Sequence, residues 1–117
     1  MKELEECFID PVTDYVAEFC HVEPEELKSR NKRQQLVLAR MLASYCMLYL
    51  GFSTILIGEL ISRDHSSIQH YKNLYRYDSL FNDHLYRFTI FMADKGIVIP
   101  SYEKWEEKLR GRNQVRC

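Results

Sequence analysis

The chain has 117 residues, a formal net charge of −1 and 46% hydrophobic residues. This length suits a single domain and excludes a nucleotide-driven motor joined to a separate DNA-reading domain. The hydrophobic fraction excludes a disordered chain, and the near-neutral charge, taken by itself, argues against a nucleic-acid partner.

The charge is distributed unevenly along the chain. Residues 1–27 contain nine acidic residues and one lysine, a net charge of −8. Residues 28–77 contain eight basic and two acidic residues, a net charge of +6, and residues 78–117 have a net charge of +1. The near-neutral total therefore hides a basic middle, which points to an anionic partner.

Helical patterns account for nearly the whole sequence, so we expect an all-α fold. Asp10 and Pro11 fit an N-cap followed by proline at the first helical position, and they predict a first helix of about three turns. Residues 24–27 predict a short second helix, and residues 28–35 form a basic connector without apolar residues. Apolar spacing then predicts a long central helix over residues 36–50.

An uncharged run over residues 41–58 is as long as a minimal membrane span. Gly51 and Ser53 interrupt it, and they predict a helix end followed by a new N-cap. We therefore expect two buried helices that meet at a turn, and no membrane segment.

The last third of the sequence predicts two further helices and one extended link. The first helix has an apolar face and ends at Gly96; the face contains Leu80, Phe81, Leu85, Phe88 and Phe91. Residues 97–100 predict an extended link without a partner strand, and Ser101 caps a last helix with Trp105 and Leu109.

Two short helices joined by a polar turn at residues 62–64 are typical of a helix-turn-helix. The second helix, which Asp64 caps, extends to about residue 75 and has Ile68, Tyr71 and Tyr75 on its inner side. Its outer side carries hydrogen-bonding groups without negative charge, which suit base edges and phosphates in a major groove: Ser66, Gln69, His70 and Asn73.

These residues resemble a known family. Arg63-Asp64-His65-Ser66-Ser67, followed by Ile68 and His70, resembles the R-D-H-[ST]-[ST]-V-x-H signature of the DNA-binding domain of DnaA, the bacterial replication initiator, in the Trp-repressor-like superfamily. The resemblance covers about residues 9–75, and its other motifs follow in order at residues 16–19, 22–27, 37–40, 43–45 and 57–58.

The resemblance implies sequence-specific binding of double-stranded DNA. Asp64, His65 and Ser66 would contact bases in the major groove, with Ser67 nearby on the backbone. An arginine of the connector would enter the minor groove, and Arg40 would pair with a phosphate. The connector offers two candidates for the minor groove, Arg30 and Arg33. Position or charge adds further DNA-binding candidates: Arg63, Gln69, His70 and Lys72.

The sequence departs from the family at two places. Ile61-Ser62 stand where the family has two glycines before the arginine, and this segment is one residue shorter here. Thr54-Ile55-Leu56 lacks the proline that the family has ahead of the first helix of the motif. Both changes would reshape the phosphate-facing loop, which puts recognition of the family's usual box sequence in question. No G-x-x-x-x-G-K-[ST] motif occurs, so we expect neither the initiator's ATPase nor a bound nucleotide.

Other classes of site fit the sequence poorly. His65 and His70 are five residues apart on a helix and cannot hold one metal ion together, and three consecutive residues cannot form a hydrolytic triad. The four cysteines form no C-x-x-C pair, and the acidic N-terminus lacks the apolar region of a secretory signal. We expect a cytoplasmic protein with reduced thiols, no cofactor and no enzymatic activity.

Several candidates also have purely structural explanations. Asp64 fits the role of a helix cap better than that of a base contact, and the two roles are compatible. The connector could be a solvated loop. The aromatic residues beyond position 70 fit a core or a dimer surface better than a base-stacking platform: Tyr71, Tyr75, Phe81, Phe88 and Phe91.

We therefore predict a DnaA-like DNA-binding domain over residues 1–77 and a helical extension over residues 78–117 that packs on it. The expected role, in a bacterium or a phage, is regulatory or accessory to replication initiation, and a transcriptional repressor is hard to separate from this. The alternative is a helical scaffold for protein–protein contact, with a homodimer or protein partner bound through residues 78–117.

Overall fold

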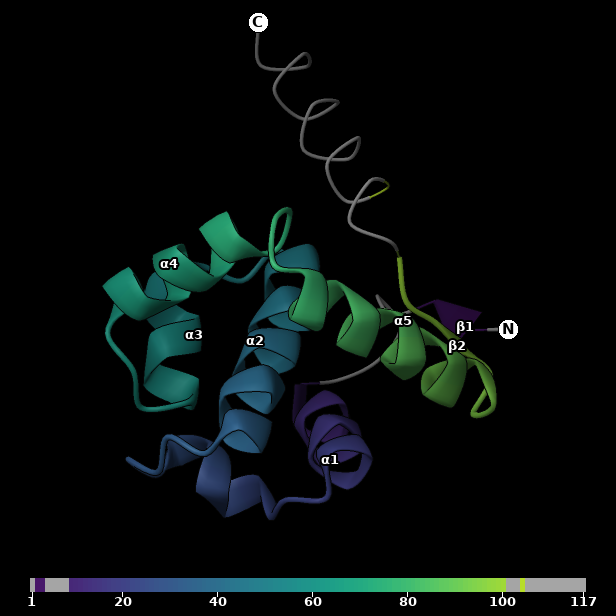
Figure 1. Cartoon of the computed structure of the whole chain (residues 1–117), viewed down its shortest axis with the longest axis horizontal. Coiled ribbons are helices and arrows are strands. Elements are labelled where there is room, and N and C mark those ends of the chain that lie inside the picture. The colour runs from purple at the N-terminus through teal and green to yellow at the C-terminus, as the bar shows by residue number, and fades with distance from the viewer. Residues whose placement is uncertain (1, 4–8, 101–103, 105–117) are drawn as a thin grey trace, which may run out of the picture.

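In the computed structural model, which describes residues 2–3, 9–100 and 104, the fold is built around the central helix α2 (Gln34–Tyr49) (Figure 1). The helices α1 (Ile9–Cys20) and α5 (Ser79–Ala93) pack on one side of α2, and α3 (Thr54–Leu60) and α4 (His65–Leu74) pack on the other. A 3₁₀ helix, η2 (Pro24–Lys28), leads from α1 into the connector. The expected all-α fold is confirmed.

The helix α2 is the core of the molecule. Its side chains from residue 38 to residue 47 are all buried, and a helix that is apolar all round is stable only when other elements surround it. The uncharged run ends where the sequence predicts, because Gly51 adopts a left-handed φ of 95° and a new helix begins at Thr54. No helix among the described residues is long and apolar enough to cross a membrane.

Three aromatic rings connect α2, α4 and α5. The ring of Tyr75 stacks on Phe81 at a centroid distance of 5.0 Å and meets Tyr45 edge-on at 5.3 Å. The hydroxyl of Tyr75 donates to the carbonyl of Met41, and the hydroxyl of Tyr45 donates to the carbonyl of Pro100 at 2.8 Å. Burial raises the pKa of Tyr75 well above its usual value, so this hydroxyl remains a neutral donor inside the core.

The helix α5 belongs to the same hydrophobic core. Phe88 is fully buried, and the ring of Phe19 from α1 lies 5.3 Å from those of Phe88 and Phe91. Beside them the thiol of Cys20 lies 3.4 Å from Nε2 of His84, and burial raises the pKa of Cys20 to about 12. One continuous hydrophobic core includes residues on both sides of position 77. The division of the chain into two parts at this position stays a prediction.

The structure corrects three local predictions. Residues 97–98 do pair, because β2 (Ile97–Val98) lies parallel to β1 (Lys2–Glu3), and strands this short leave no periodic pattern in a sequence. The first helix begins at Ile9, one residue before the expected cap. Leu80, placed on the apolar face of α5, is 51% exposed. The last helix predicted from Ser101 lies almost entirely outside the described residues.

The helices α3 and α4 form the expected helix-turn-helix corner. Ser53 caps α3 by accepting a hydrogen bond from the N–H of Leu56 at 3.1 Å. The carbonyl of Gly58 accepts from the N–H of Arg63 at 2.7 Å, and a Cβ at Gly58 would lie 2.4 Å from the carbonyl oxygen of Arg63. The corner closes this tightly because residue 58 has no side chain.

One charged side chain, that of Arg40 on α2, lies inside the protein and is only 1% exposed. Its Nε donates to the carbonyl of Leu27 at 2.9 Å, and its Nη2 donates to the carbonyls of Glu26 at 3.1 Å and Ser29 at 2.8 Å. Burial, followed by the nearby charge of Arg63, lowers the pKa of Arg40 from its usual value. The expected role of Arg40 as a phosphate partner stays a prediction, and its Nε and Nη2 hold the backbone that leads into the connector.

The close approach at Gly58 predicts the effect of a single methyl group. Gly58→Ala should lower the free energy of unfolding by about 1–3 kcal/mol, as overpacking does, although alanine favours helix over glycine. Chemical denaturation followed by circular dichroism measures the change, with Glu59→Ala, at an exposed neighbouring position, as the control. Unchanged or increased stability of Gly58→Ala would contradict the close packing of the corner.

The buried guanidinium predicts a second stability effect. Arg40→Met fills similar space but leaves carbonyls without a donor, so the free energy of unfolding should fall by about 2–4 kcal/mol. The control is Arg87→Met, because Arg87 is 70% exposed and its ion pair with Asp83 should contribute about 0.5 kcal/mol or less. Equal, small losses in both variants, measured by urea denaturation, would show that Arg40 does not hold the connector.

Candidate nucleic-acid interface

The outer face of α4 presents a row of hydrogen-bonding side chains to solvent. Ile68 and Tyr75 are fully buried on the inner face, and they fix the rotation of the helix about its axis. The outer face then exposes donors and acceptors close to the N-terminus of α4 and along its first turns: Asp64, His65, Ser66, Gln69, His70 and Asn73. Asp64 occupies the N-cap position, but its side chain makes no capping hydrogen bond there. Its carboxylate is thus available to other partners.

The turn before α4 is fastened to the connector. Nη2 of Arg63 donates to the carbonyl of Ser29 at 2.6 Å, and Nη2 of Arg40 donates to the same carbonyl at 2.8 Å. Arg63 therefore has a structural partner as well as its expected place near DNA. The bond from Arg63 joins residues that are 34 positions apart in the sequence, and the bond from Arg40 joins residues that are 11 apart.

The connector itself is an ordered loop. Asn31 donates its backbone N–H to Oγ of Ser29 at 3.3 Å, and its side-chain oxygen accepts from the N–H of Arg33 at 3.0 Å. Asparagine side chains stabilise turns in this way. The basic side chains of the loop therefore project from defined positions, with Arg30 and Lys32 both exposed.

A hollow of about 540 Å³ lies between the connector and α4. The residues around it include cations from the connector, α2 and the turn, together with hydroxyls and an imidazole from α4: Lys32, Arg40, Arg63, Ser66, Ser67 and His70, with Val37 and Tyr71. No carboxylate is among these lining residues. Positive charge combined with hydroxyl donors is the chemistry that binds a phosphate of a nucleic-acid backbone.

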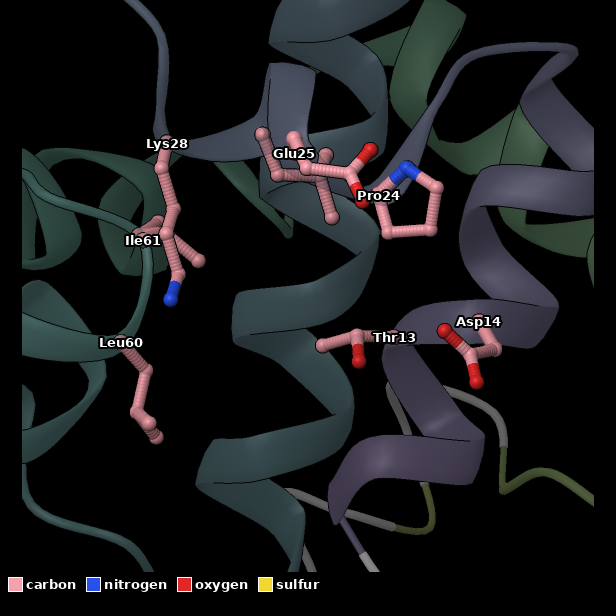
Figure 2. Close-up of a pocket in the computed structure, with 8 residues that line it drawn as sticks. Thr13, Asp14, Pro24, Glu25, Lys28, Leu60 and Ile61 are labelled. Atoms are coloured by element: carbon pink, nitrogen blue, oxygen red, sulfur yellow. The ribbon is translucent and has the colours of Figure 1, made fainter.

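A second hollow, of about 470 Å³, has a different chemistry (Figure 2). It lies between α1, η2 and the end of α3, with Asp14 and Glu25 on one side and Lys28 beside Ile61 on the other. Two carboxylates at its rim repel a polyanion, since like charges are unfavourable at short range. This hollow is therefore not part of the candidate interface.

The predicted DNA-binding residues fall into two groups. The first group lines the first hollow: Arg40, Arg63, Ser66, Ser67 and His70. The second group does not line it; its members are exposed, apart from the half-buried Lys72: Arg30, Arg33, Asp64, His65, Gln69 and Lys72.

Sequence reasoning missed two residues of this region. Lys32 lines the hollow, and only its place in the basic connector could have suggested it. Ile55 is 63% exposed and lines a third hollow with Asp64 and His65, at one of the positions where the sequence departs from the DnaA pattern. An exposed isoleucine beside the polar side chains of Asp64 and His65 leaves no signal in apolar periodicity.

The sequence matches a known protein family over the region that contains the helix-turn-helix. The family model described as bacterial DnaA protein helix-turn-helix matches residues 9–73, which is more than half of the chain. No curated protein matches the sequence. This family suggests binding of double-stranded DNA related to replication initiation. By the extent of this match, and with α3, the turn and α4 formed as a helix-turn-helix, the chain belongs to the bacterial DnaA helix-turn-helix family.

Proposed function

We propose that this protein is a sequence-specific DNA-binding protein that acts in a regulatory or accessory role in replication initiation, without ATPase or other enzymatic activity. The observation that carries this proposal is the hollow between the connector and α4, which is lined by the cations of Lys32 and Arg63 and by the hydroxyl residues Ser66 and Ser67. The hollow would bind phosphates, and the exposed face of α4 next to it would contact base edges. One surface thus offers both kinds of contact to the same duplex.

The proposed binding mode places the N-terminal half of α4 in the major groove. The exposed imidazole of His65 and the amide of Gln69 have the donors and acceptors that read base edges. A phosphate that enters the hollow would fix the register of α4, because backbone contacts position a reader and base contacts specify the sequence. The connector lies beside the reading helix and is placed to follow the same duplex.

A second candidate function has its own observation. Tyr86 is 65% exposed and Ile90 is 49% exposed, one helical turn apart on the outer face of α5. Exposed apolar groups of this kind favour protein contact, so a scaffold or a homodimer remains the alternative function. A gel-shift series at low and moderate salt distinguishes the two, because a scaffold should retain no duplex even at low salt.

The proposal predicts that the protein will select a sequence. Rounds of selection from a random duplex library should enrich one motif, and binding to that duplex should be about 10³-fold or more tighter than to unselected DNA. Fluorescence anisotropy at fixed salt measures both affinities. Enrichment of no motif, with equal binding to all duplexes, would contradict sequence-specific recognition.

The role of His65 predicts a loss of discrimination. His65→Ala should weaken binding to the selected duplex by about 1–3 kcal/mol and leave binding to a random duplex nearly unchanged, because it removes a base contact. His21→Asn is the matched control: His21 is exposed in the turn after α1, outside the helix-turn-helix, and asparagine tolerates its φ of 57°. Equal losses on both duplexes would reject the assignment of His65 as a reading residue.

A further inference from the structure

The two arginines of the connector differ in their surroundings. Nη2 of Arg33 lies 2.7 Å from Oε2 of Glu26, and the two side chains are 50% and 33% exposed. Arg30 is exposed, and its side chain makes no hydrogen bond or ion pair with any residue that the structure describes. One arginine therefore has a carboxylate partner and the other has only solvent.

Glu26 is itself held in place. Its Oε1 accepts the backbone N–H of Glu23 at 3.0 Å, which is one half of a capping box at the start of η2. The other carboxylate oxygen, Oε2, receives Arg33. Because one oxygen anchors the carboxylate to η2, Glu26 cannot follow Arg33 toward a ligand without breaking the cap.

We propose that Glu26 is a positioning residue that withholds Arg33 from the DNA backbone and leaves Arg30 as the connector arginine that meets DNA. This inference rests on the proposed DNA-binding function. A phosphate that takes Arg33 must separate an existing ion pair and leaves the charge of Glu26 uncompensated beside the polyanion. A phosphate that takes Arg30 displaces only water and counterions, so Arg30 makes the contact at lower cost.

The salt dependence of binding to a random duplex tests this inference. Glu26→Gln keeps an oxygen acceptor for the N–H of Glu23 but removes the charge that holds Arg33. We expect about two- to fivefold tighter binding and a slope of log affinity against log salt that is steeper by about 0.9, the value for one added phosphate contact. Glu25→Gln is the control, because Glu25 is an exposed acid of the same helix without an ion pair to a described residue.

The two arginines are then removed one at a time. In the wild-type protein Arg30→Ala should make the slope shallower by about 0.9, and Arg33→Ala should change it little. In the Glu26→Gln background Arg33→Ala should remove the added contact and return the slope to its wild-type value. The single arginine variants test the inference even where Glu26→Gln does not fold.

The outcomes separate this inference from the proposed function. Equal tightening by Glu26→Gln and Glu25→Gln would mean that only overall charge matters, and equal effects of the two arginine substitutions in the wild-type protein would mean that Glu26 withholds nothing. Either result overturns the inference while DNA binding stands. A wild-type protein that binds no duplex at low salt would instead overturn the proposed function, and this inference with it.

Discussion

The arrangement of the candidate interface depends on one backbone oxygen, the carbonyl of Ser29, which accepts hydrogen bonds from both Arg40 and Arg63. The two guanidinium groups come from the central helix α2 and from the turn before α4, so this carbonyl joins three segments of the chain. Bringing two like charges together and burying one of them is costly, and the lowered pKa of Arg40 reflects that cost. Charge-assisted hydrogen bonds to backbone carbonyls offset it. These bonds hold the start of the connector beside the turn that leads into α4.

The same contacts occupy part of the positive charge that the sequence places in its middle. Residues 28–77 have a net charge of +6, but some of their basic side chains already have partners within the protein. Arg40 is buried, Arg63 shares the carbonyl of Ser29, and Arg33 is paired with Glu26. The acidic N-terminal part thus supplies one partner of the basic connector, through Glu26. Fewer free cations remain for bulk attraction to DNA, which shifts the proposed recognition toward contacts with bases.

The departures from the DnaA pattern fall where the corner is tightest. Ser62, at a position where the family has glycine, adopts a φ of 54°, a left-handed conformation that costs most L-residues about 1–2 kcal/mol. Gly58 supplies the close approach that lets the shortened turn close. The helix-turn-helix therefore forms without the two glycines. Ile55, in the segment that lacks the family's proline, lines one hollow together with His65.

The sequence by itself determined the helices, the cap at Ser53, the helix end at Gly51, the corner and the polar face of α4, because each of these depends on residues within about two helical turns of one another. Only the tertiary structure decided which basic residues are free. Arg40 and Arg33 look alike in the sequence, yet one is buried against carbonyls and the other pairs with a carboxylate seven residues away. The pairing of Lys2 with Ile97 and the convergence of Arg63 on Ser29 also join distant segments. Burial and charge pairing depend on which segments meet in space, and local periodicity carries no information about that.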